Sequence, residues 1–199
     1  MTGDAHPRDM TSTSGRRSYI RMLIEFPGML RAAAHRLVTP AYFRKLGRGG
    51  LIFGPQNFAH PYLDIRIGDR FMLGRRIFWQ VAKGAAIRIG DRVSINDSCF
   101  LVCSAAISIG DNVAIAEHVS IRDQEHLFDP DHGVRDQGYK TAPISIEENC
   151  WIGRGCYISP GAHIRRGSIV AANSVVRGEF PSDSLIAGAP AVVKKSLRS

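Results

Sequence analysis

Aliphatic residues recur at every sixth position through the middle and the C-terminal half of the chain. In the last stretch, a small residue stands four positions after most of these aliphatic residues. A period of six fits neither an amphipathic helix nor a strand that alternates its two faces. It fits a triangular coil of three short strands and about 18 residues per turn, which stacks into a parallel β-helix. The aliphatic positions are Ile89, Ile95, Leu101, Ile109, Ile115 and Ile121, followed by Ile146, Ile152, Ile158, Ile164, Val170 and Val176.

The regular part of the pattern extends from about residue 62 to residue 187. Its spacing is irregular between residues 73 and 87, and it shifts by two residues between Leu101 and Ile109. We expect corner insertions at both places, because extra residues at a corner leave the strands themselves unchanged.

One long break separates Ile121 from Ile146. The intervening segment is polar and contains Pro and Gly, so it predicts a loop over residues 122–143 that leaves the coil. A histidine among carboxylates suits a general base, because one ring nitrogen takes a proton while a carboxylate orients the other. On spacing alone, a solvated acidic loop explains these residues better. The candidates are Asp123, Glu125, His126, Asp129, Asp131 and His132.

The composition is that of an ordinary globular protein, but the charge is strongly basic. The 199 residues carry a formal net charge of +8, which suggests an anionic partner. No nucleic-acid motif is present, so we do not expect a nucleic-acid partner. The chain has no secretory signal and no apolar run long enough for a membrane span, which predicts a cytoplasmic protein. Its four cysteines, Cys99, Cys103, Cys150 and Cys156, fit no zinc template and are expected in the core.

The first 50 residues differ from the rest and are expected to form a basic extension. Residues 1–15 are rich in Ser, Thr and Gly and predict disorder. Residues 17–46 carry apolar and basic side chains at helical spacing. Two interpretations stay open: a helical cap on the first coil, which we favour, or a basic amphipathic segment that touches the inner face of an anionic membrane.

Three segments carry a resemblance to a known family: IRDQEHLFDP, QGYKTAPISIEENCWIGRGCYISPGAHI and SLIAGAPAVVKK. The chain resembles the hexapeptide-repeat O-acetyltransferases, including galactoside and maltose acetyltransferases and enzymes of polysaccharide biosynthesis. The resemblance covers roughly residues 50–195. It implies an all-β fold, a left-handed parallel β-helix of about six coils with one ejected loop. The expected organisation is a helical extension over residues 1–50 and a β-helix domain over residues 51–199 that ends in a basic tail.

The resemblance also implies a reaction. Acetyl-CoA would be the donor, and a hydroxyl of a sugar or glycan precursor would be the acceptor. The catalytic histidine of the family falls on His126, with Asp123 or Glu125 to orient it; we favour Asp123. No metal is implied.

Further site residues follow from the same resemblance. Around the acceptor we expect Asn96 and Trp151, with Ser104 in a stretch where the galactoside and maltose enzymes carry an acidic residue. That departure leaves the acceptor undetermined. The residues expected to bind the CoA moiety are Arg154, Ala172, Arg177, Lys194 and Lys195.

The family implies a homotrimer with its active sites between subunits. Alternatives stay open: transfer to an amino-sugar nitrogen, transfer of a longer acyl group, or a non-catalytic β-helix binding protein. A metal-dependent hydratase like the γ-type carbonic anhydrases is disfavoured. Those enzymes need two histidines five residues apart, whereas His118 and His126 are eight apart.

Overall fold

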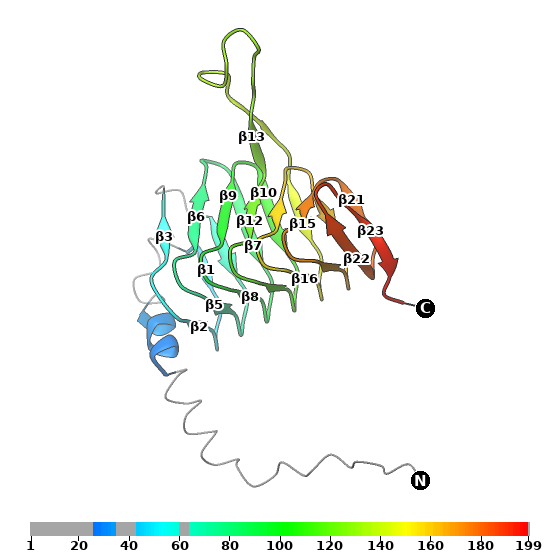
Figure 1. The fold of residues 1–199 in the computed structure, drawn as a ribbon. Coiled ribbons are helices and arrows are strands. Elements are labelled where there is room, and N and C mark those ends of the chain that lie inside the picture. The colour runs from blue at the N-terminus through cyan, green and yellow to red at the C-terminus, as the bar shows by residue number, and fades with distance from the viewer. Residues whose placement is uncertain (1–25, 35–42, 60–63, 199) are drawn as a thin grey trace, which may run out of the picture.

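The structure, a computed structural model, describes residues 26–34, 43–59 and 64–198, and it is a parallel β-helix with three faces (Figure 1). Each strand pairs with the strand one coil further on, so three parallel sheets extend along the molecule. The third sheet has six strands, one from each complete coil, so the molecule has six complete coils. This confirms the predicted fold class.

The strands are short, and successive strands of the coil belong to sheet 1, sheet 2 and sheet 3 in turn. Sheet 1 contains β1 (Lys45–Leu46), β4 (Ile65–Ile67), β7 (Ala86–Ile89), β10 (Ala106–Ile109), β15 (Ile144–Ile146), β18 (His163–Ile164) and β21 (Glu179–Phe180). Sheet 2 contains β2 (Leu51–Ile52), β5 (Met72–Leu73), β8 (Ser94–Ile95), β11 (Ala114–Ile115), β16 (Trp151–Ile152), β19 (Ile169–Val170), β22 (Ser184–Gly188) and the antiparallel β23 (Ala191–Ser196). Sheet 3 contains β3 (Asn57–Phe58), β6 (Phe78–Val81), β9 (Phe100–Cys103), β12 (Ser120–Arg122), β17 (Tyr157–Ile158) and β20 (Val175–Val176).

The core is the stack of aliphatic residues that the period of six identified. Ile109 pairs with Ile89 on one side and with Ile146 on the other, and all three are buried. Each such side chain contributes roughly 1.5–3 kcal/mol by leaving water. The four cysteines are also buried in this core, as expected.

The β-helix begins earlier than the sequence analysis placed it. Strand β1 pairs with β4 through Lys45 and Leu46, inside the segment assigned to the N-terminal extension. Leu46, Ile52 and Phe58 are six residues apart and mark this first coil. A single triplet is too short to establish a period, and only Leu46 is followed by a small residue, Gly50, at the fourth position.

The prism has three edges, named here by the sheets that the chain joins: 1–2, 2–3 and 3–1. Both predicted irregularities lie at the 3–1 edge. From Trp79 the chain needs ten residues to reach the next inward position at Ile89, and from Leu101 it needs eight to reach Ile109. The predicted corner insertions are therefore confirmed, and they share one edge with the long loop.

The sequence Ile-Gly-Asp occurs at residues 67–69, 89–91 and 109–111, and it forms three successive corners of the 1–2 edge. The amide of Asp69 donates to the carboxylate of Asp91 at 2.8 Å, and the amide of Asp91 donates to that of Asp111 at 2.7 Å. Each aspartate thus satisfies a backbone donor of the preceding coil. A Cβ at Gly90 would overlap the Asp111 carboxylate, which explains why glycine precedes aspartate.

A helix over residues 26–34 lies against the first coil (Figure 1). Gly28 and Ala32 are buried, and Arg31 donates a hydrogen bond to the carbonyl of Phe53 at 2.7 Å. The described helix therefore packs on the coil as a cap. Predictions for residues 1–25 and 35–42 lie outside the described residues. No helix in the described part of the chain is both long and apolar enough to cross a membrane.

Candidate active site

The predicted loop is an antiparallel hairpin that projects from the 3–1 edge (Figure 1). Its strands are β13 (Gln124–His126) and β14 (Tyr139–Thr141), and they follow β12 and precede β15. His126 pairs with Tyr139 across the hairpin, and their ring centroids are 4.4 Å apart. The hairpin thus holds the imidazole away from the coil, on a short strand rather than on irregular backbone.

His126 is exposed and borders an open cavity of about 720 Å³ within the hairpin. No hydrogen bond or ion pair engages its ring among the described residues. Its nitrogens are therefore available to a ligand, which a general base requires. The lining residues are His126, Val134, Arg135, Asp136, Gly138 and Tyr139.

Asp123 does not orient His126 in this chain, contrary to the expectation from resemblance. The Asp123 side chain is fully buried at the root of the hairpin. Its carboxylate accepts hydrogen bonds from the amides of Ser104 at 2.6 Å and Ala105 at 2.8 Å. Its carbonyl accepts one from Ala142 at 2.9 Å, which ties the two ends of the hairpin together. Asp123 thus fixes the hairpin on the coil.

Glu125 is likewise engaged elsewhere. Its carboxylate forms an ion pair with Arg177 at 2.7 Å. Arg177 follows β20 at the same edge, so the pair links the hairpin to a corner two coils away. The structure therefore joins Glu125 to a residue expected at the cofactor, and neither carboxylate contacts the imidazole of His126 within the described residues.

A second group of predicted residues lies along the 2–3 edge. Asn96 borders an open cavity of about 500 Å³ together with Glu117 and His118. Arg154, one coil further, forms an ion pair with Glu117 at 3.0 Å. Ala172, which is exposed, follows on the next coil. Its amide nitrogen would lie 2.6 Å from a Cβ added to Gly153. The coils approach closely at Gly153 and Ala172, where neither residue has a bulky side chain.

The predicted residues therefore form two groups within one chain. Ser104, Asp123, Glu125, His126 and Arg177 lie at the 3–1 edge, while Asn96, Arg154 and Ala172 lie at the 2–3 edge. Sheet 3 separates the two groups. Trp151 is half exposed on the outer face of sheet 2, and Lys194 and Lys195 are exposed on β23, which pairs with β22 in that same sheet.

The cysteines are not candidate nucleophiles. Burial raises the pKa of Cys99 to about 12, and burial with the nearby Asp123 carboxylate raises that of Cys103 to about 12. Such thiols stay protonated at neutral pH, and the thiolate is the reactive form. Within the described residues, no three His, Cys, Asp or Glu side chains are grouped to hold a metal ion.

Comparison with known proteins agrees with the repeat and the fold. Residues 143–178 match the model of the bacterial transferase hexapeptide, which describes six repeats. A probable acetyltransferase of Mycobacterium tuberculosis is 32% identical over 152 residues, which are 74% of this chain. A galactoside O-acetyltransferase of Lactococcus lactis is 30% identical over 114 residues, or 57% of this chain.

A solved structure also matches most of the chain. It is a hexapeptide-repeat acetyltransferase of Vibrio cholerae, complexed with acetyl coenzyme A, with 25% identity and a TM-score of 0.58. The match covers 94% of this chain and 93% of that one. The two sequence relatives are longer than the part they share: the match spans 50% of the mycobacterial protein and 55% of the lactococcal enzyme.

Proposed function

Because the chain belongs to the hexapeptide-repeat transferases, we propose that it is an acetyl-CoA-dependent O-acetyltransferase that acts on a sugar or glycan hydroxyl. The observation that carries this proposal is the hairpin. It interrupts an otherwise regular β-helix once, and it presents an exposed His126 over an open cavity. The galactoside O-acetyltransferase among the relatives supports transfer to oxygen, and the acetyl-CoA complex of the Vibrio structure supports the donor.

The reaction needs one base and one oxyanion site. His126 takes the proton of the acceptor hydroxyl while its oxygen attacks the thioester carbonyl. Backbone N–H groups at a coil edge stabilise the negative charge on the carbonyl oxygen. The C–S bond then breaks, and the protonated imidazole returns the proton to the departing sulfur. The transfer is direct, so no acyl-enzyme forms on the buried cysteines.

A homotrimer completes the proposed site. One chain holds His126 at the 3–1 edge and Asn96 at the 2–3 edge, so a site that uses both needs two chains. Sheets 2 and 3 also carry apolar residues on their outer faces. In a closed trimer with heterologous interfaces, sheet 2 of one chain packs on sheet 3 of the next, so both faces are buried in each chain. These residues are Met72, Trp151, Ile169 and Leu185 on sheet 2, and Phe78, Phe100, Tyr157 and Val175 on sheet 3.

The CoA moiety is proposed to lie along the 2–3 edge. Arg154 provides charge for the phosphates, and small Ala172 lets the pantetheine approach the backbone. Lys194 and Lys195 lie on β23 near Leu185, at the start of β22, and are proposed to attract the phosphates from there. Arg177, held by Glu125, would join the site from the hairpin side. Sedimentation at several concentrations tests the assembly, with an expected mass of three times 21.8 kDa.

The direct test of the function is His126→Ala. Loss of a general base is expected to lower kcat by about 10²-fold or more. The matched control is His132→Ala, because His132 lies in the same loop but pairs with Asp129 at 2.9 Å. The measurement is product mass after incubation with acetyl-CoA and a panel of sugars. Equal activity of H126A and the unchanged protein would remove the catalytic assignment.

We also propose that the protein acts in the cytoplasm, at the membrane face. The helix over residues 26–34 buries its small side chains and exposes Phe26, Met29 and Leu30, each by about half. An apolar stripe within a basic extension suits an anionic bilayer. Flotation with phosphatidylglycerol vesicles tests this, with F26S/M29S/L30S expected to stay unbound. Equal flotation of both proteins, or concentration-dependent self-association through the stripe, contradicts it.

A further inference from the structure

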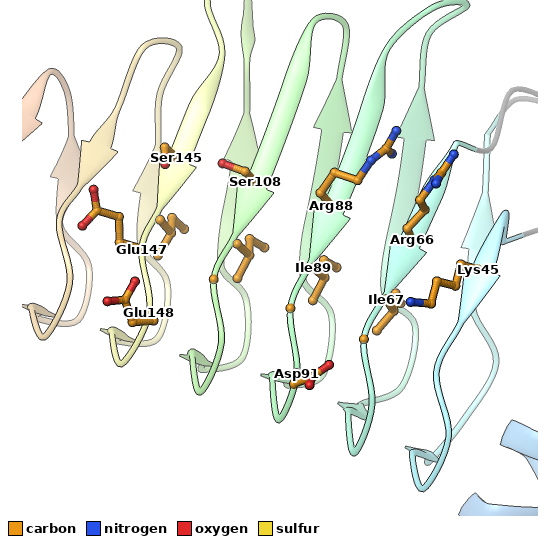
Figure 2. Close-up of a pocket in the computed structure, with 15 residues that line it drawn as sticks. Lys45, Arg66, Ile67, Arg88, Ile89, Asp91, Ser108, Ser145, Glu147 and Glu148 are labelled. Carbon is orange, nitrogen blue, oxygen red and sulfur yellow. The ribbon is translucent and has the colours of Figure 1, made fainter.

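The outer face of sheet 1 carries a ladder of charge that the proposed reaction does not use. Its outward positions are in register, strand by strand, and they change from basic at the N-terminal end to acidic at the C-terminal end. Figure 2 shows most of this face, which borders a shallow groove of about 560 Å³. The ladder reads Lys45, Arg66, Arg88, Ser108, Ser145, His163 and Glu179.

The basic end contains more positive charge than its single carboxylate can neutralise. Asp64 lies 2.8 Å from Arg88, 3.3 Å from Arg66 and 3.9 Å from Arg44. Lys45 is the register neighbour of Arg66. Three guanidinium groups thus lie within 4 Å of one carboxylate, and Lys45 adds a fourth positive charge on the neighbouring strand. Like charges on neighbouring strands destabilise a sheet, because they lie only about 5 Å apart.

The two central guanidinium groups are fixed in position. Arg88 donates to the carboxylate of Asp64 and, at 3.0 Å, to the carbonyl of the same residue. Arg66 donates to that carboxylate through Nε alone, and its two terminal nitrogens have no acceptor among the described residues. Figure 2 shows both side chains extending in the same direction. A fixed pair with free donors is a typical setting for a phosphate group, which accepts bidentate bonds from arginine.

The groove continues from this basic end toward the hairpin. Ser108 and Ser145 follow Arg88 on the next two strands, and the hairpin enters sheet 1 directly before β15, the strand of Ser145. Two strand spacings, or about 10 Å, separate Arg88 from Ser145. That is the length of one or two sugar units. The small hydroxyl side chains leave room for a ring and offer hydrogen bonds to it.

From these contacts we infer that sheet 1 binds a glycan acceptor that carries a phosphate or diphosphate. The inference rests on the proposed function and names its substrate class. The phosphate lies on Arg66 and Arg88, with the sugar over Ser108 and Ser145. Glu147 and Glu148 border the far end of the groove and repel an anion there. The phosphate therefore binds only at the arginine end, which fixes the orientation of the ligand. The phosphate belongs to either a nucleotide sugar or a lipid-linked sugar, since both present the same group.

The first test measures binding without catalysis. Isothermal titration uses inorganic pyrophosphate as the probe, with the intact protein and with R66Q/R88Q. The double variant is expected to bind at least tenfold more weakly. The matched control is R165Q, because Arg165 is equally exposed near the acidic half of the same face, where it pairs with Glu179. Unchanged affinity in R66Q/R88Q, or an equal loss in R165Q, overturns the inference.

The second test separates the two sources of phosphate and separates this inference from the proposed function. Acetyl transfer is measured to UDP-glucose, to polyprenyl-diphosphate-linked glucose in micelles, and to neutral methyl glucoside. R66Q/R88Q is expected to raise KM about tenfold for whichever phosphate-bearing acceptor is used, with KM for acetyl-CoA unchanged. An equal KM for that acceptor in both proteins overturns the inference. Absence of transfer to every acceptor counts against the proposed function, while the pyrophosphate titration still decides the binding site.

Discussion

The 1–2 edge and the 3–1 edge of the prism are built from the same coil yet behave in opposite ways. At the 1–2 edge, the first four coils repeat one solution, in which the aspartate of the next coil accepts a backbone donor beside a glycine. At the 3–1 edge, each corner differs in length, and one corner extends into the hairpin. The first edge holds the coils together, and the second carries the side chains with chemistry.

The difference follows from what each corner must satisfy. A corner whose polar groups bond to the neighbouring coil cannot change length without breaking that bond, so it stays uniform. A corner whose two ends stay bonded to the coil, as Asp123 bonds to Ser104 and Ala105, can accept insertions between those ends, because loop closure costs little per added residue. Functional groups therefore gather where the coil tolerates variation. The predictions below test this division between the edges.

The largest effect is expected from replacing residues 124–141 by a short Gly-Ser linker. His126 is lost with the hairpin, so acetyl transfer should fall by at least about 10²-fold. The melting temperature should change little, because the hairpin packs mainly on itself and its root at Asp123 is retained. Activity assays and thermal unfolding followed by circular dichroism measure the two quantities. A molecule that no longer folds without the hairpin would show that the 3–1 edge is structural after all.

The same division explains what the sequence predicted and what it did not. The coil was predictable because the inward positions, such as Ile146 and Ile152, repeat with a fixed period that needs no knowledge of contacts. The position of the hairpin was predictable for the same reason, since it interrupts that period. His126 needed the family resemblance as well, because on spacing alone a solvated loop explains a histidine among acids better.

The roles of the carboxylates depended on three-dimensional neighbours that spacing does not reveal. Asp123 lies three residues before His126, and the family resemblance suggested an orienting role for it. Its true partners are the amides of Ser104 and Ala105, one coil earlier. The charge ladder of sheet 1 was hidden for a similar reason. Arg66 and Arg88 are 22 residues apart in sequence and become neighbours only when the length of the corner between them is known.

The next effect concerns the root of the hairpin. Asp123→Ala leaves two partly buried amides, those of Ser104 and Ala105, without an acceptor, so we expect a loss of about 2–4 kcal/mol in the free energy of unfolding. Asp129→Ala is the control, because Asp129 also accepts two amides, from Asp131 and His132, but its side chain is 42% exposed in the loop. Its cost should stay below about 1 kcal/mol. Urea unfolding compares the two, and equal losses would contradict the structural role of Asp123.

A pair of glycine substitutions compares the two edges directly. Gly90→Ala at the 1–2 edge places a Cβ against the Asp111 carboxylate and 2.9 Å from backbone atoms of the next coil. We expect a loss of about 1–3 kcal/mol, as for other overpacked sites. Gly84→Ala lies at the 3–1 edge, where the added Cβ meets nothing within 4 Å. Only its positive φ of 84° resists the change, which costs about 1 kcal/mol. A larger loss for G84A than for G90A would reverse the proposed division.

The smallest effect is expected at the ion pair that links the hairpin to the coil. Glu125→Gln and Arg177→Gln each break a 2.7 Å contact between exposed side chains, so each should change the free energy of unfolding by less than about 1 kcal/mol. Their effects on catalysis should differ in kind. Loss of Arg177 removes a positive charge proposed for the cofactor phosphates, so KM for acetyl-CoA should rise several-fold. Loss of Glu125 frees that arginine and should leave this KM unchanged or lower it. Steady-state kinetics with both variants decides between them: if E125Q raises KM as much as R177Q does, the pair serves to hold the hairpin in place, and Arg177 has no separate role at the cofactor.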